Sequence, residues 1–168
     1  MIPFLQADVL AKPEPLDFYD ALRLSSFGGD IEFNAATTTV YATDNSVYQV
    51  QPQGVIYPRG FEDLQQIAQL LQRQEFRHLI MAMRGGGTGT NGQSLTDGIV
   101  VDTSRYMNRI LSIDPEKRIA RVQSGVVKDQ LNKALKPYGL FFAPELSTSN
   151  RATIGGMINT DACGQGSC

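Results

Sequence analysis

Cysteine, histidine and tryptophan are nearly absent from this chain of 168 residues, which contains two cysteines, one histidine and no tryptophan. Cys163 and Cys168 stand near the C-terminal end, and the single His78 is distant from them in sequence. A pair of thiols without a neighbouring ligand is a poor start for a metal or cluster site, which usually needs four ligands. We therefore expect no metal and two reduced thiols, as is usual inside the cell, with metal ligation as the weaker alternative.

The sequence also lacks a surplus of charge and any long apolar run. Its 15 basic and 17 acidic residues give a net charge of −2, which argues against nucleic acid as a partner. No segment approaches the roughly 20 apolar residues that a membrane span requires, and residues 1–15 have no sustained apolar run of the kind found in a secretory signal. We therefore expect a cytoplasmic protein, in which local backbone dipoles would have to hold any anionic ligand.

Hydrophobic residues make up 42% of the chain, enough for one domain with its own core. Residues 1–33 are expected to form an N-terminal arm with a short helix over 16–24, and residues 34–168 are expected to form the main domain. The stretch 34–53 is rich in Thr, Asn and Gln. It is predicted to be a loop with at most a short strand at 47–50.

From residue 55 onward, short apolar segments alternate with segments of helical periodicity. Strands are predicted at 55–57, 79–83, 99–101, 109–114 and 118–123, and helices at 61–71 and 127–135. The first strand, helix and strand form a unit that makes a parallel pair by a right-handed crossover, with the second strand buried. The turn at 114–117 makes the last two strands antiparallel. The predicted fold class is therefore α+β, with a mixed parallel and antiparallel sheet and flanking helices.

A glycine-rich loop, Arg84–Gln93, directly follows the predicted strand at 79–83. Its five glycines allow positive φ angles and a close approach of the backbone to a ligand. Successive exposed N–H groups in such a loop form a concave anion site, to which Arg84 would add charge and Thr88 and Thr90 hydroxyl donors. The natural ligand is a dinucleotide pyrophosphate or a nucleotide phosphate, and a flexible turn without a ligand is the alternative.

Two familiar phosphate-binding motifs match the letters of this loop but not its context. Gly87-x-Gly89-x-x-Gly92 satisfies the Rossmann fingerprint, and the same segment approaches a P-loop with Gln93 in place of the lysine. Both motifs must open a helix whose N-terminus faces the phosphates. Residues 93–98 lead directly to the next strand and leave no room for a helix, so both interpretations are rejected.

A second glycine-containing segment lies downstream. Residues 144–149 form a polar loop, and residues 152–164 follow with a Gly155–Gly156 pair among Ser, Thr and Asn donors. Alone, this pattern is equally typical of an ordinary loop closure. Paired with the first loop, it becomes much more specific for a ligand site made of two segments.

The loop RGGGT ending in Gly-Gln, followed by ATIGGMINTDA, resembles the FAD-binding domain of the vanillyl-alcohol oxidase/PCMH superfamily. Within this superfamily the chain is most similar to the FAD-linked 2-hydroxyacid dehydrogenases. Gly29–Ile31 and the segment TDNS at 43–46 resemble the corresponding segments of the large bacterial D-2-hydroxyglutarate dehydrogenases, which fuse a flavin part to an iron–sulfur part. The resemblance covers residues 30–168. It implies a PCMH-type FAD-binding fold, with the first subdomain and the start of the second, incomplete at the C-terminal end.

The resemblance also implies a flavin site shared by the two glycine segments. The first would wrap the pyrophosphate, with Gln93 closing the loop, and the second would line the flavin and its diphosphate. Some relatives attach FAD covalently through a histidine at the position of Thr88, so a non-covalent FAD is implied here. The implied cofactor-binding residues are Arg84, Gly85, Gly86, Gly87, Thr88, Gly89, Thr90, Gln93, Pro144, Thr148, Thr153, Gly156, Asn159, Ala162 and Gly164.

The implied activity is hydride transfer to flavin N5 from a small 2-hydroxyacid of the D-2-hydroxyglutarate or D-lactate type, with electrons passed to an acceptor other than oxygen. No residue of the chain qualifies as the catalytic base, and His78 is expected to be structural. The substrate would bind through parts outside this chain, so the chain alone is expected to be inactive. The alternatives are an aldonolactone oxidase or enolpyruvyl-sugar reductase on the same scaffold, and a flavin- or nucleotide-binding module without catalysis.

Overall fold

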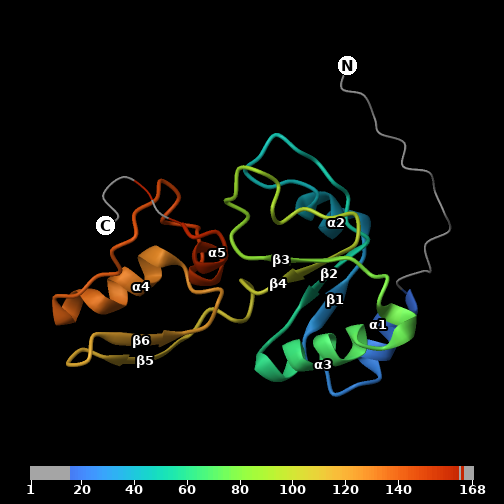
Figure 1. The fold of residues 1–168 in the computed structure, drawn as a ribbon, viewed down its shortest axis with the longest axis horizontal. Coiled ribbons are helices and arrows are strands. Elements are labelled where there is room, and N and C mark those ends of the chain that lie inside the picture. The colour runs from blue at the N-terminus through green and yellow to red at the C-terminus, as the bar shows by residue number, and fades with distance from the viewer. Residues whose placement is uncertain (1–15, 163, 165–168) are drawn as a thin grey trace.

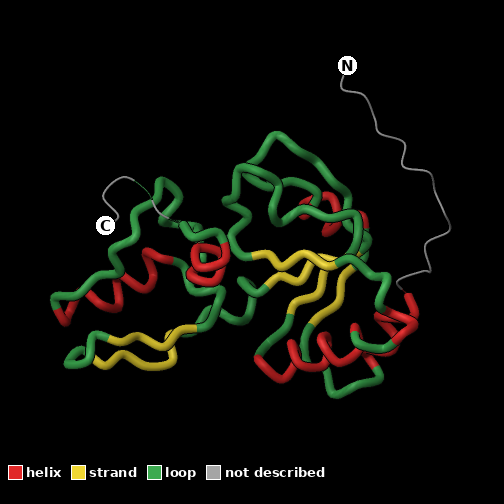
Figure 2. Tube along the Cα trace, in the orientation of Figure 1, coloured by secondary structure: helices red, strands yellow, loops and turns green. Residues whose placement is uncertain are grey.

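Two lobes lie side by side in the computed structural model, which describes residues 16–162 and 164 (Figure 1). The first lobe contains a four-stranded sheet, and the second contains a two-stranded sheet (Figure 2). Cys163, Cys168 and residues 1–15 of the predicted arm lie outside the described residues. No helix in the described part of the chain is long and apolar enough to cross a membrane.

The sheet of the first lobe has the strand order β1-β2-β4-β3. Strand β1 runs antiparallel to β2, whereas β2 and β3 both run parallel to β4. The mixed sheet that the sequence predicted is therefore confirmed. The strands are β1 (Asp30–Glu32), β2 (Gly54–Tyr57), β3 (Met81–Arg84) and β4 (Ile99–Asp102).

The predicted parallel pairing of β2 with β3 is wrong in one respect, because β4 lies between them. Val101 of β4 stands opposite Ile56 of β2 on one side and Met83 of β3 on the other. All four residues of β4 are buried, so this strand takes the centre of the sheet, where both faces are covered. Strand β3 is half-exposed and forms an edge, whereas the sequence had predicted a buried strand.

Helices cover both faces of this sheet. Helices α1 (Leu16–Arg23) and α3 (Phe61–Leu71), both predicted, pack their apolar residues against Ile56 and its neighbours on one face. The opposite face carries Val55, which packs with Tyr41 and other aromatic residues. Residues 16–33 thus share a sheet and a core with the residues after them. The domain boundary at residue 34 stays a prediction.

Helix α2 (Ala35–Tyr41) occupies a stretch that the sequence predicted to be a loop. Its run of threonines has a low helix propensity, which explains the wrong prediction. Asn34 caps the helix, because its side chain accepts a hydrogen bond of 2.9 Å from the backbone N–H of Thr37. The strand predicted at 47–50 is reduced to an isolated bridge between Thr43 and Gln49.

The second lobe is built from a hairpin and two helices. Strands β5 (Ile110–Asp114) and β6 (Ile119–Val122) are antiparallel, as predicted, and α4 (Lys128–Leu135) follows them. Helix α5 (Ile154–Asn159) was not predicted, since its two adjacent glycines are typical of a loop. The apolar residues of α4 and α5 share one core with those of the hairpin.

Candidate cofactor site

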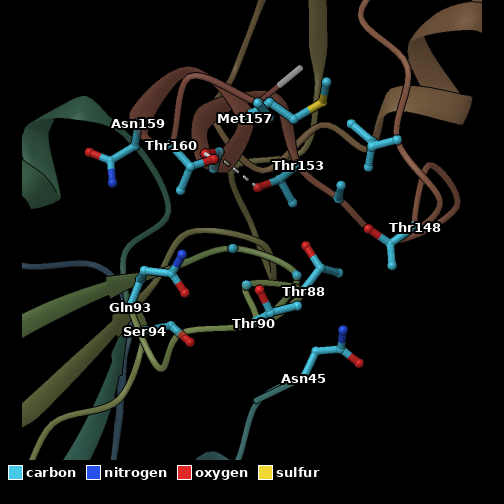
Figure 3. A pocket seen from close by; sticks show the side chains of 18 of the residues that line it. Asn45, Thr88, Thr90, Gln93, Ser94, Thr148, Thr153, Met157, Asn159 and Thr160 are labelled. Atoms are coloured by element: carbon cyan, nitrogen blue, oxygen red, sulfur yellow. Dashed lines mark hydrogen bonds between the residues drawn. The ribbon is translucent and has the colours of Figure 1, made fainter. Parts of the chain in front are cut away.

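A cleft of about 430 Å³ lies where the glycine loop of the first lobe faces α5 and the loop before it in the second lobe (Figure 3). Thr88, Thr90 and Gln93 belong to one wall, and Thr153 and Asn159 belong to the other. The cleft is therefore made by the two segments that the sequence analysis paired.

The glycine loop turns sharply without starting a helix. Gly87 and Gly92 have φ angles of 61° and 73°, in the left-handed region that favours glycine. The carbonyl of Gly87 accepts a hydrogen bond of 3.0 Å from the backbone N–H of Asn45, which ties the loop to the segment after α2. Residues 93–98 contain no helix, so the rejection of the Rossmann and P-loop motifs is confirmed.

The loop presents a row of unpaired backbone donors. Among the residues that the structure describes, none accepts a hydrogen bond from the backbone N–H groups of residues 86–89. Unpaired N–H groups on consecutive residues form an anion-binding concavity, and they need a partner from outside the chain or from water. This wall is thus suited to a phosphate group.

The two walls touch directly at two glycines. A Cβ atom added to Gly86 would lie 2.1 Å from the carbonyl oxygen of Arg151, and one added to Gly85 would lie 2.1 Å from the Oγ1 of Thr153. Both distances are far shorter than any van der Waals contact. Because glycine has no Cβ atom, the two walls can lie as near to each other at these positions as the structure shows.

In the opposite wall, the backbone donors at the start of α5 are occupied. The N–H groups of Ile154 and Gly155, at the start of α5, donate to the carbonyls of Val126 and Ser124, both at 2.8 Å. The Oγ1 of Thr153 caps the helix by accepting from the N–H of Gly156 at 3.3 Å. The start of α5 consequently offers hydroxyl and amide side chains rather than free N–H groups.

No charged side chain lines the cleft in the described part of the chain. Its polar lining consists of hydroxyl and amide side chains and glycine backbone, and its apolar lining includes Met83, Leu146 and Met157. A bound anion would therefore be held by peptide dipoles, as the near-neutral charge of the sequence led us to expect.

Most of the predicted site residues meet in this cleft. Arg84, Pro144 and Gly164 do not line it, and the exposed His78 lies in a turn before β3. The predicted residues that line it are Gly85, Gly86, Gly87, Thr88, Gly89, Thr90, Gln93, Thr148, Thr153, Gly156, Asn159 and Ala162.

The structure adds residues to the site that the sequence analysis did not select. Asn45 and Ser147 were within reach of prediction, because each lies in a segment whose resemblance to the family had been noted. Met83 and Met157 carry no signal in the sequence, since only the fold shows which side of β3 and α5 faces the cleft. The added lining residues are Asn45, Met83, Ser94, Leu146, Ser147, Ala152, Met157 and Thr160.

Comparison with known proteins identifies the family. Residues 52–168 match the FAD binding domain family. The chain belongs to that family. A D-2-hydroxyglutarate dehydrogenase of Pseudomonas putida is 63% identical over 152 residues, which cover 90% of this chain and 15% of that protein. The chain thus spans about 15% of the length of curated relatives of this kind.

Solved structures with the same architecture support the fold. An alkyldihydroxyacetonephosphate synthase matches with a TM-score of 0.76 at 18% identity, over 91% of this chain and 33% of that one. A p-cresol methylhydroxylase (PCMH) matches with a TM-score of 0.63 at 18% identity, over 76% of this chain and 26% of that one. The PCMH-type FAD-binding fold that the sequence resemblance implied is therefore confirmed.

The cleft fits the cofactor of this family. FAD carries two linked phosphates, and the wall of the glycine loop offers consecutive N–H groups without a partner. The contacts at Gly85 and Gly86 leave no room for a side chain where the two walls meet. The residues present are thus suited to a dinucleotide pyrophosphate.

Proposed function

We propose that this chain is the FAD-binding part of an FAD-linked dehydrogenase that oxidises a 2-hydroxyacid of the D-2-hydroxyglutarate type. The observation that carries the proposal is the cleft, whose uncharged, glycine-rich wall is suited to a pyrophosphate. The substrate class follows from relatives named D-2-hydroxyglutarate dehydrogenase, which are 53–63% identical to this chain. We assign the substrate pocket, the catalytic base and the path to the electron acceptor to the remainder of the protein.

Each wall has a distinct task in this proposal. The N–H groups of residues 86–89 hold the pyrophosphate, and Thr88 and Gln93 add side-chain donors. Thr148, Thr153 and Asn159 of the other wall provide uncharged polar groups along the flavin and its diphosphate. Arg84, Pro144 and Gly164 do not line the cleft and are not assigned a contact with FAD.

When bound, FAD supplies the acceptor for the hydride that leaves the substrate. The chain itself holds the cofactor and fixes its orientation. None of the described residues that line the cleft has a charged group that would compete with the pyrophosphate for the loop. Thr88 is not a histidine, so we propose that FAD is held without a covalent bond. We place the protein in the cytoplasm, consistent with a sequence that has no disulfide framework.

The test uses the full-length protein that carries this domain. After gel filtration it should retain a flavin that acid releases, and anaerobic D-2-hydroxyglutarate should bleach the flavin absorbance. The L-enantiomer is the matched control, and D-lactate distinguishes the two substrate types. A flavin that stays oxidised with every 2-hydroxyacid would contradict the dehydrogenase proposal and favour a binding module without catalysis.

A further inference from the structure

Arg84 occupies the last position of β3, directly before the glycine loop, but its side chain lies behind the loop. Its guanidinium donates to the carbonyl of Thr43 at 2.8 Å and to that of Tyr41 at 3.5 Å. Tyr41 is the last residue of α2, so the guanidinium also lies at the carbonyl end of a helix, where a positive charge is favourable. Two of its five N–H donors are therefore used on carbonyls of residues that do not line the cleft.

The guanidinium rests on an aromatic ring that is itself anchored. The centre of the Arg84 guanidinium lies 5.0 Å from the centre of the Tyr41 ring, within the range of a cation–π contact. The Tyr41 hydroxyl donates to the buried Asp102 at 2.7 Å. Burial, followed by the bond to Asp102, raises the pKa of Tyr41 above its ordinary value, so the hydroxyl keeps its proton.

Arg84 also touches the back of the loop. A Cβ atom added to Gly87 would lie 2.6 Å from one of the Arg84 amino groups, so the guanidinium lies directly against a residue that lines the cleft. Asn45, two residues after Thr43, donates to the carbonyl of Gly87. The segment after α2 thus contacts both the guanidinium, through the carbonyl of Thr43, and the loop, through the N–H of Asn45, and the guanidinium lies against the loop.

The charge of Arg84 is not cancelled by an acid. Its hydrogen bonds go to carbonyl oxygens, and no ion pair involves it among the described residues. A half-buried cation directly behind the loop adds to the potential that the N–H groups create on the other side. An anion in the cleft would therefore be attracted by the N–H dipoles of the loop and by the charge of Arg84.

We propose that Arg84 is a positioning residue. It rests on the Tyr41 ring and supports the glycine loop on the side away from the cleft, and its charge attracts the phosphates across the loop without a direct contact. The proposal rests on the proposed function, because it requires FAD in the cleft. It differs from the expectation that the sequence position of Arg84 suggests, which is direct contact with the phosphates.

Titrations of the full-length apoprotein with FAD test the proposal. Arg84→Met should raise the Kd for FAD by about tenfold or more, the range of typical coupling between distinct sites. Arg84→Lys keeps the charge and should recover part of the affinity, together with a dependence of Kd on salt that the methionine variant has lost. Equal Kd values for the lysine and methionine variants would show that the charge plays no part and would overturn the proposal.

A double-mutant cycle separates positioning from direct contact. Tyr41→Leu removes the ring that lies on the far side of Arg84 from the cleft, and Tyr41→Phe is its matched control because it keeps the ring. If Arg84 acts from the Tyr41 ring, the double variant Tyr41→Leu/Arg84→Met should bind FAD no more weakly than Arg84→Met alone. Fold-changes that multiply would show that Arg84 binds FAD independently of Tyr41 and would overturn the proposal.

FAD binding by the cleft and the role of Arg84 in that binding can be tested separately. A wild-type protein that takes up no FAD would contradict the proposed function, and the role of Arg84 would be lost with it. Wild-type binding with an unchanged Kd in Arg84→Met would leave the proposed function intact and remove only the positioning role. Circular dichroism of each apoprotein establishes that the variants compared are folded.

Discussion

Gly86 shows how a single missing methyl group sets the width of the cleft. The atom that blocks a side chain there is the backbone carbonyl oxygen of Arg151. A backbone atom cannot rotate away as a side chain can, so a larger residue must push the two walls apart. The identity of this one residue therefore bears directly on cofactor binding.

We expect Gly86→Ala to weaken FAD binding in the full-length protein. Overpacking a tight contact costs roughly 1–3 kcal/mol, which corresponds to a rise of about 5-fold to 160-fold in Kd. The matched control is Gly28→Ala, because a Cβ atom there would meet its nearest atom at 3.7 Å, an ordinary contact. Equal affinity in both variants would show that the walls do not need this close approach. The readout is the Kd for FAD from a fluorescence titration.

Arg84 illustrates what a motif reveals about a residue and what it does not. Its position before the glycine loop is visible in the sequence, and the resemblance to the family placed it at the phosphates. The direction of its side chain depends on α2, which supplies Tyr41, and on the segment after that helix, which supplies the carbonyl of Thr43. Because that helix was not predicted, the orientation of Arg84 was out of reach.

At the scale of elements, an ion pair between a buried lysine and an exposed glutamate connects α4 to the loop that lines the cleft. The side chain of Lys128 is 3% exposed, and its Nζ lies 3.2 Å from the Oε1 of Glu145, whose side chain is 54% exposed. Glu145 directly precedes the lining residues 146–148. The pair therefore connects the start of a helix to one wall of the cleft.

The unequal burial of the two partners predicts unequal effects of substitution. Glu145→Gln leaves a buried ammonium without its counter-charge, which should cost about 1–3 kcal/mol. Lys128→Met should cost less, because it replaces the buried amine with an apolar chain of similar length and leaves a carboxylate that water can reach. Urea unfolding of the two variants measures the difference. The reverse order of stability would contradict this assignment.

Elements with a strong apolar pattern could be predicted from the sequence, and those held by caps could not. The run Ile99–Val101 and the period of α3 carry their own signal, since burial alone determines them. Helices α2 and α5 depend on the caps Asn34 and Thr153 and on contacts with the rest of the fold. The place of β4 between β2 and β3 depends on pairing between distant strands, which no local pattern contains.

At the scale of the whole molecule, the first lobe is tied together by a charged cluster at one end of its sheet. Arg105 donates to Glu32 of β1 at 2.7 Å, and the Tyr106 hydroxyl donates to Asp30. Arg59 lies over the Tyr106 ring at 4.6 Å. These contacts hold the short edge strand β1 to the segment that follows β4.

This cluster makes the stability of the lobe dependent on acid. The hydrogen bond from Tyr106 lowers the pKa of Asp30 below its ordinary value, and the hydrogen bond from Arg105 does the same to the pKa of Glu32. The unfolded state then binds protons at higher pH than the folded state. The stabilisation is present above the ordinary carboxyl values and is lost as the pH falls through the lowered ones.

We therefore expect the urea midpoint to fall between pH 5 and pH 3, and to fall less in Asp30→Asn/Glu32→Gln. At pH 7 the double variant should be less stable than the wild type, because the neutral amides at positions 30 and 32 no longer form ion pairs with Arg59 and Arg105. Glu116→Gln, on the exposed turn between β5 and β6, is the control. A double variant with the pH profile of the wild type would show that the cluster contributes nothing.

The proposed function depends on FAD binding in the cleft between the glycine loop and α5. The most direct measurement is the absorbance spectrum of the full-length protein after incubation with FAD and removal of the excess by gel filtration, for the wild type and for Gly86→Ala. Flavin bands should stay with the wild-type protein, should be released by acid and should be weaker in the variant. Wild-type protein without flavin bands, or a variant that retains them equally, would contradict FAD binding in this cleft.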